Sequence, residues 1–151
     1  MRPEPLELHI DRLLDAPRHL VFTVWTKPEH AAMWWGPQKF TVISCKMDVR
    51  PGGSWRKVMR RADGFTVVKF GAYREVVEPE RLVFTYRDEQ PDGTLTPETL
   101  VTVTFTEEAG KTRLRLHQMG FEELASRNGH VGGWTSAMER LAHYLATAEG
   151  G

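Results

Sequence analysis

Residues 130–145 read HVGGWTSAMERLAHYL, and the apolar residues of this stretch repeat with the period of an α-helix. Steps of three and four residues place five of them on one side of the predicted helix: Val131, Trp134, Met138, Leu141 and Leu145. The pair Gly132-Gly133 costs about 1 kcal/mol per glycine relative to alanine, so we expect it where the helix needs room. A helix with one apolar side must bury that side against another element. We expect Asn128 to cap this helix.

The partner is a sheet, because strand patterns fill most of the remaining sequence. Leu6, Leu8 and Ile10 alternate with polar residues, which is the pattern of a half-buried strand. Turn signals rich in Gly, Pro and Asp separate six further predicted strands, over 40–50, 54–61, 65–77, 81–87, 98–106 and 112–119. Their short connections predict antiparallel neighbours, since a parallel pair needs a crossover of about a dozen residues.

Two short helices are predicted between the first strand and the second. Asp15 and Pro17 suit the cap and the first turn of one helix. Thr26 and Glu29 fit a capping box that begins the other, over 28–34. The order predicts an α+β fold in which a curved antiparallel sheet of about seven strands holds the C-terminal helix, since long antiparallel sheets twist. Space that the helix leaves unfilled would form a cavity.

Composition limits the class of protein. The chain has 151 residues, 20 basic and 20 acidic side chains and a formal net charge of zero, which suits one globular domain over 1–151. The balanced charge argues against a nucleic-acid-binding protein. Cys45 is the only cysteine, so a disulfide scaffold is excluded and a reducing compartment is expected. The sequence shows neither a signal-peptide pattern nor an apolar run long enough to span a membrane, so we expect a cytoplasmic protein without membrane insertion.

Several local motifs resemble one protein family, in the same order along the chain. They are Ala16-Pro17, Trp34-Trp35-Gly36-Pro37, 48–53 (DVRPGG), 76–83 (VVEPERLV) and 130–134 (HVGGW) with the apolar residues that follow. Together they resemble the activator-of-heat-shock-protein-90-ATPase-like family of the START and birch-pollen-allergen (SRPBCC) superfamily. The resemblance implies a helix-grip fold with an apolar cavity between the sheet and the last helix. The superfamily includes lipid carriers, hormone receptors and some cyclases, so function must be argued from the site.

Candidate ligand-binding residues come from both walls of the expected cavity. The residues are Trp134, Met138 and Leu141 on the helix, Phe84, Tyr86, Trp55, Phe70, Met59 and His117 on the strands, and Trp35 at the mouth. Each has a plainer interpretation. The helix stripe and the aromatic residues are also what core packing requires, and His117 could be an exposed strand residue. Strand register decides between these interpretations, because a slip of one residue reverses every face.

The searches for catalytic and metal-binding motifs give no candidate. The sequence has no G-x-S-x-G elbow, no C-x-x-C pair and no H-x-x-x-H spacing, so no catalytic residue, metal or cofactor is predicted. We therefore expect binding of a small hydrophobic or amphipathic ligand. One alternative is a chaperone-associated interaction module, which the family name suggests. Another is a cavity-based cyclase or hydrolase, which needs an inward acid or base with a shifted pKa. An exposed edge strand could also support a homodimer.

Overall fold

A seven-stranded antiparallel sheet and three helices make up the computed structural model, which describes residues 6–36 and 39–149. The elements are β1 (Leu6–Leu14), α1 (Arg18–Thr26), α2 (Pro28–Trp34), β2 (Phe40–Met47), β3 (Ser54–Arg61), β4 (Thr66–Val77), β5 (Arg81–Glu89), β6 (Thr99–Glu108), β7 (Lys111–Phe121) and α3 (Leu124–Glu149). The strand order is β1-β7-β6-β5-β4-β3-β2, and every neighbouring pair is antiparallel. The predicted helix-grip fold is confirmed.

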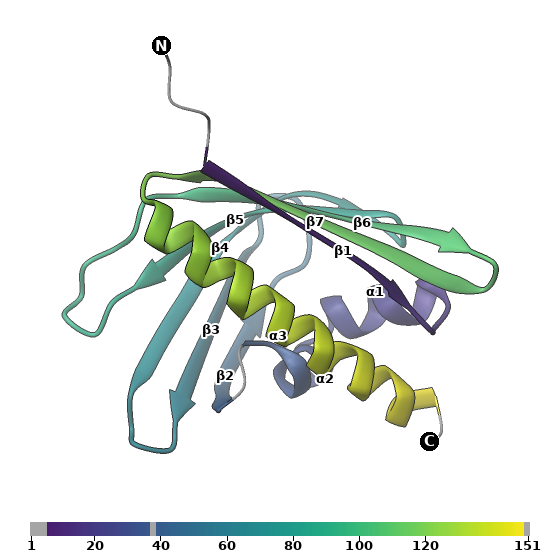
Figure 1. The fold of residues 1–151 in the computed structure, drawn as a ribbon, viewed down its shortest axis with the longest axis horizontal. Helices are drawn as coiled ribbons and strands as arrows, with labels where there is room; N and C mark the ends of the chain where they lie inside the picture. The colour runs from purple at the N-terminus through teal and green to yellow at the C-terminus, as the bar shows by residue number, and fades with distance from the viewer. Residues whose placement is uncertain (1–5, 37–38, 150–151) are drawn as a thin grey trace, which may run out of the picture.

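The long helix α3 runs diagonally across the concave side of the curved sheet (Figure 1). Helices α1 and α2 lie on the same side, near the C-terminal half of α3 (Figure 1). None of the helices in the described ranges has the length and apolar character that a membrane crossing would require. Because both short helices lie near the C-terminal half of α3, neither of them lies beside its N-terminal half (Figure 1).

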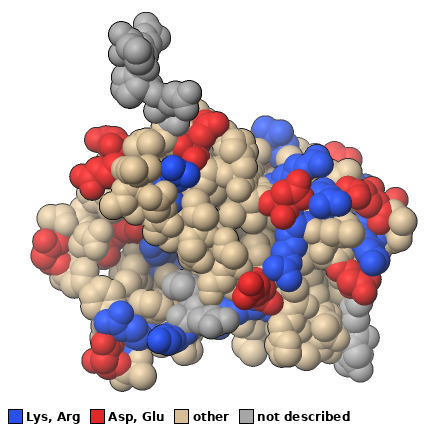
Figure 2. Space-filling model, in the orientation of Figure 1, with Lys and Arg blue, Asp and Glu red and all other residues tan. Residues whose placement is uncertain are grey.

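Successive residues of each strand point alternately toward α3 and toward solvent. On β7, Leu114, Leu116 and Gln118 are fully buried, whereas the intervening Arg113 and Arg115 form ion pairs on the outer face. Basic and acidic side chains are interspersed over the surface that Figure 2 shows, and the chain carries 20 of each. The apolar alternation read from the sequence thus corresponds to the two faces of the sheet.

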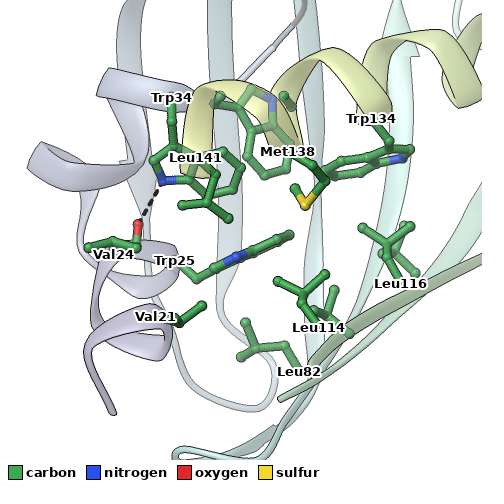
Figure 3. Close-up of a cluster of buried hydrophobic side chains, with 14 of the residues drawn as sticks. Val21, Val24, Trp25, Trp34, Leu82, Leu114, Leu116, Trp134, Met138 and Leu141 are labelled. Carbon is green, nitrogen blue, oxygen red and sulfur yellow. Dashed lines mark hydrogen bonds between the residues drawn. The ribbon is translucent and has the colours of Figure 1, made fainter. Parts of the chain in front are cut away.

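A tryptophan cluster ties the helices to the sheet. Trp34 is fully buried, and its indole nitrogen donates a hydrogen bond to the backbone oxygen of Val24 at 3.0 Å (Figure 3). The Trp25 ring stacks on that of Trp134, with centroids 6.2 Å apart. Trp134, Met138 and Leu141 enter the same core from α3 (Figure 3). The predicted apolar stripe of α3 therefore packs as a core over its C-terminal half.

Three predicted helix caps are wrong. The hydroxyl of Thr26 donates to the backbone oxygen of Phe22 at 2.8 Å, so Thr26 ends α1 and Lys27 occupies the N-cap position of α2. Pro17, not Asp15, occupies the N-cap position of α1. Helix α3 begins at Leu124, so Asn128 lies inside it. Threonine side chains can bond the carbonyl four residues earlier, which is the competing interaction in the first case.

We expect Met138→Ala to lower the free energy of unfolding by about 2–5 kcal/mol, because Met138 is fully buried and its loss leaves a cavity. Glu139→Ala is the control, since Glu139 is exposed on the next helix position and should change stability by less than about 0.5 kcal/mol. Urea denaturation followed by circular dichroism measures both. Equal stability of the two variants would contradict this account of the core.

Candidate functional site

A cavity of about 690 Å³ lies between the N-terminal half of α3 and the central strands. Most of its lining comes from β3, β4, β5, the segment that joins β5 to β6, and the α3 residues from Ala125 to Ala137. Single residues of β2, β6 and β7, the Trp35-Gly36 turn and the turn before α3 complete it. Gln90, Thr94 and Leu95 form part of an exposed rim. In Figure 2 the surface is hollowed at the left, between α3 and this β5–β6 segment. The cavity lies where α3 has neither short helix beside it.

Small residues on one side of α3 leave the space open. Ser126, Gly129, Gly133 and Ala137 follow one another at steps of three and four and all line the cavity. A Cβ atom added at Gly129 or Gly133 would meet no atom within 4 Å. Gly132, by contrast, is exposed and does not line the cavity. The glycine pair therefore contributes room through Gly133.

A chain of buried hydrogen bonds fixes the aromatic wall. The indole nitrogen of Trp134 donates to Gln118 Oε1 at 2.8 Å, and Gln118 Nε2 donates to Thr99 Oγ1 at 2.8 Å. The Thr99 hydroxyl donates in turn to the backbone oxygen of Tyr86 at 2.8 Å. Gln118 has no exposed surface, so breaking this chain would leave buried polar groups unpaired. The Trp134 ring is therefore held in place before any ligand arrives.

The polar end of the cavity contains an ion pair and a histidine. Lys69 and Asp88 are cross-strand partners on β4 and β5, and Lys69 Nζ lies 2.8 Å from Asp88 Oδ1. His130 Nε2 lies 3.6 Å from Asp88 Oδ2. The three side chains are only 15%, 11% and 15% exposed, respectively. They form a partly desolvated polar cluster, which we call the Lys69–Asp88–His130 cluster.

The electrostatics of this cluster keep Asp88 ionised and Tyr86 protonated. Burial acts to raise the pKa of Asp88, but His130 and the Lys69 ammonium outweigh it, and the pKa lies below the usual value for an aspartate. Burial, together with the nearby Asp88 carboxylate, raises the pKa of Tyr86 well above the usual value for a tyrosine. The cavity therefore presents a carboxylate and a phenolic O–H near one another.

The sequence-predicted site residues fall into three groups. Those that line the cavity are Trp134, Tyr86, Met59 and Trp35. Those buried in the core beside it are Trp55, Phe84, Met138 and Leu141. Phe70 pairs with Arg56 on the face opposite the cavity, and His117 stacks on His9 on the outer face of β1 and β7. The assigned ligand-binding roles of all ten residues remain predictions.

Sequence reasoning missed the Lys69–Asp88–His130 cluster. The alternation of strand faces could have indicated Asp88, because it lies two residues beyond Tyr86 on β5 and therefore points to the same face of the sheet. Helical spacing could have indicated His130, because it lies one turn before Trp134 and therefore on the same side of the helix. Lys69 could be placed only once the register between β4 and β5 was known.

A second group on the outer face could hold a metal ion. Glu7, His9 and His117 offer ligand atoms that all lie within 4.8 Å of one another. The strands bring them together, since His9 pairs directly with His117 and Glu7 lies two residues from His9. These residues lie on two paired strands, so they do not show the helical H-x-x-x-H spacing in the sequence.

Lys57 is a buried cation beside the cavity but does not line it. Its side chain points inward from β3, where Nζ lies 3.7 Å from the centroid of the Trp35 ring and 4.5 Å from that of Trp55. Lys57 is only 2% exposed, and burial lowers its pKa to about 8. Cation–π contacts with the two indoles offset part of the cost of burying the ammonium.

Three comparisons place the chain among known proteins. The family model described as Activator of Hsp90 ATPase homolog 1-like protein matches residues 15–146. The structure of the AHSA1 protein from Silicibacter pomeroyi is 26% identical, with coverage of 94% of this chain and 99% of that one and a TM-score of 0.84. A protein from Nitrosomonas europaea is 25% identical, with 97% coverage of each chain and a TM-score of 0.82. No curated protein gives a significant sequence match.

We expect Lys57→Met to raise the free energy of unfolding at pH 7 by about 1–3 kcal/mol, because it removes a buried charge. The wild-type penalty is complete below the folded-state pKa of about 8 and disappears as pH rises toward the ordinary lysine value of 10.5. The stability difference between the two proteins should therefore shrink from pH 7 to pH 10. Urea denaturation at several pH values measures it, and a difference independent of pH would contradict the assignment.

Proposed function

The chain belongs to the Activator of Hsp90 ATPase homolog 1-like family, and from its cavity we propose that it binds a small amphipathic molecule between the sheet and α3. The observation that carries the proposal is the cavity itself. Its volume of about 690 Å³ falls within the range of roughly 300–1,000 Å³ that is typical of small-molecule sites. Aromatic side chains supply much of its lining, with a few polar groups at one end.

Burial of ligand carbon would drive binding. Each Å² of apolar ligand surface removed from water contributes about 25 cal/mol, before the costs of ordering the ligand are subtracted. Those costs fall when the protein side of the site is already fixed. The hydrogen bond that holds Trp134 against Gln118 provides such preorganisation.

An acid–base enzyme is less well supported by the same residues. A carboxyl group that acts as a general acid near neutral pH needs a raised pKa. The pKa of Asp88, the cavity carboxylate beside His130, is instead lowered, which suits a permanently charged binding group.

The family description supports a second candidate function, association with a heat-shock-protein-90 homologue. In that case the outer surface of the sheet would carry the activity, and the cavity would matter only for stability. ATPase stimulation of a bacterial homologue by the purified protein tests this candidate. Stimulation that survives filling of the cavity would favour it over ligand binding as the main function.

We expect Gly133→Leu to weaken binding of the fluorescent probe N-phenyl-1-naphthylamine at least tenfold. The added side chain would enter the cavity, and its Cβ meets no atom within 4 Å. Gly132→Leu is the matched control, because the same change one residue earlier points away from the cavity. Neither variant should lose helix stability, since each replaces a helical glycine with a better helix former.

Fluorescence titration gives the probe affinity, and urea denaturation confirms that both variants are folded. Failure of the wild-type protein to bind the probe would contradict the proposed function. Equal binding by the Gly133→Leu and Gly132→Leu variants would also contradict it, because the probe would then occupy another place.

A further inference from the structure

Building on the proposed function, we propose that the cavity selects neutral ligands with a hydroxyl group, a phenol or an alcohol, over ligands with a carboxylate. The charges and hydrogen-bonding groups around the Lys69–Asp88–His130 cluster carry this proposal. The cluster lies within an otherwise largely apolar cavity, so it would decide which polar end of a ligand is accepted.

The charges that line the cavity disfavour an anion. Lys69, the one lysine among the lining residues that the structure describes, already pairs with Asp88 at 2.8 Å. Glu122 and Glu123 add two exposed carboxylates to the rim. The second buried lysine, Lys57, is held against the Trp35 and Trp55 rings outside the lining. A ligand carboxylate would therefore meet acidic side chains without an uncompensated cation to bind it.

The histidine geometry calls for a hydrogen-bond donor. His130 Nδ1 lies 2.8 Å from the backbone oxygen of Ser126, and a carbonyl oxygen only accepts, so Nδ1 carries the proton. His130 Nε2 faces the Asp88 carboxylate at 3.6 Å, which is longer than a direct hydrogen bond. Nε2 is buried and has no hydrogen-bond partner among the described residues. A ligand group that reaches this point meets the Asp88 carboxylate, which only accepts, so the ligand must donate.

Tyr86 supplies the complementary group. Its ring lies 5.5 Å from the His130 ring, and the residue lines the cavity. Because its pKa is raised, the phenol remains protonated and can donate. A ligand hydroxyl can accept from Tyr86 while it donates to the Asp88 carboxylate. An ether or a carboxylate cannot donate, so neither satisfies the cluster.

The test uses three competitors with the same apolar body: 4-propylphenol, 4-propylanisole and 4-propylbenzoate. Each is titrated against the protein loaded with N-phenyl-1-naphthylamine at pH 8.0, where a phenol is uncharged and a benzoate is ionised. We expect 4-propylphenol to bind at least tenfold more tightly than 4-propylanisole, and 4-propylbenzoate to bind most weakly. Equal binding of the phenol and the anisole, or strongest binding of the benzoate, would overturn the inference while probe binding still supports the proposed function.

Two variants connect the preference to the cluster. Asp88→Asn leaves the Lys69 ammonium without its counter-charge, so the ratio of benzoate to phenol affinity should rise at least tenfold. His130→Phe keeps an aromatic ring and should reduce the preference for phenol over anisole. His143→Phe, on an exposed position of α3, is the control and should behave as wild type. An unchanged preference in folded His130→Phe and Asp88→Asn proteins would overturn the assignment.

Discussion

The hydrogen bond from the Trp134 indole to Gln118 joins α3 to the sheet at the point where the core gives way to the cavity. C-terminal to it, Met138 and Leu141 pack fully against the short helices and strands. N-terminal to it, Gly129 and Gly133 leave the helix surface without side chains, and space remains. Because Gln118 is itself held by Thr99, the position of α3 over the curved sheet is specified by a buried polar link rather than by apolar packing alone.

The placement of charge inside the fold follows from strand pairing. Cys45, Lys57, Lys69 and Asp88 form a row across four neighbouring strands, each opposite the next in register. Burying such groups costs free energy unless each is paired or held against a polarisable surface. Asp88 compensates Lys69, and two indole rings partly compensate Lys57. Apolar residues at these four positions would give a more stable core, and only Lys69 and Asp88 of the row line the cavity.

The sequence was sufficient to predict the fold, but it predicted only some of the residues that line the cavity. Periodicity identified the seven strands, the two short helices and the apolar side of α3, and the motif resemblance is borne out by the family match over residues 15–146. The predicted helix caps at Thr26 and Asn128 are wrong. The Thr26 hydroxyl bonds the backbone oxygen of Phe22 instead, and α3 begins four residues before Asn128. Lys69 and His117 required cross-strand register, which depends on bulges such as that between Tyr73 and Glu75.

The central claim is that the hollow under the N-terminal half of α3 is where a ligand binds. Two-dimensional ¹H–¹⁵N NMR during titration with N-phenyl-1-naphthylamine tests it most directly. The account predicts concentration-dependent shifts of the Trp134 indole resonance and of the Gly129 and Gly133 amides, with the His117 amide on the outer face unchanged. Shifts confined to the outer face of the sheet, or none at saturating probe, would contradict it.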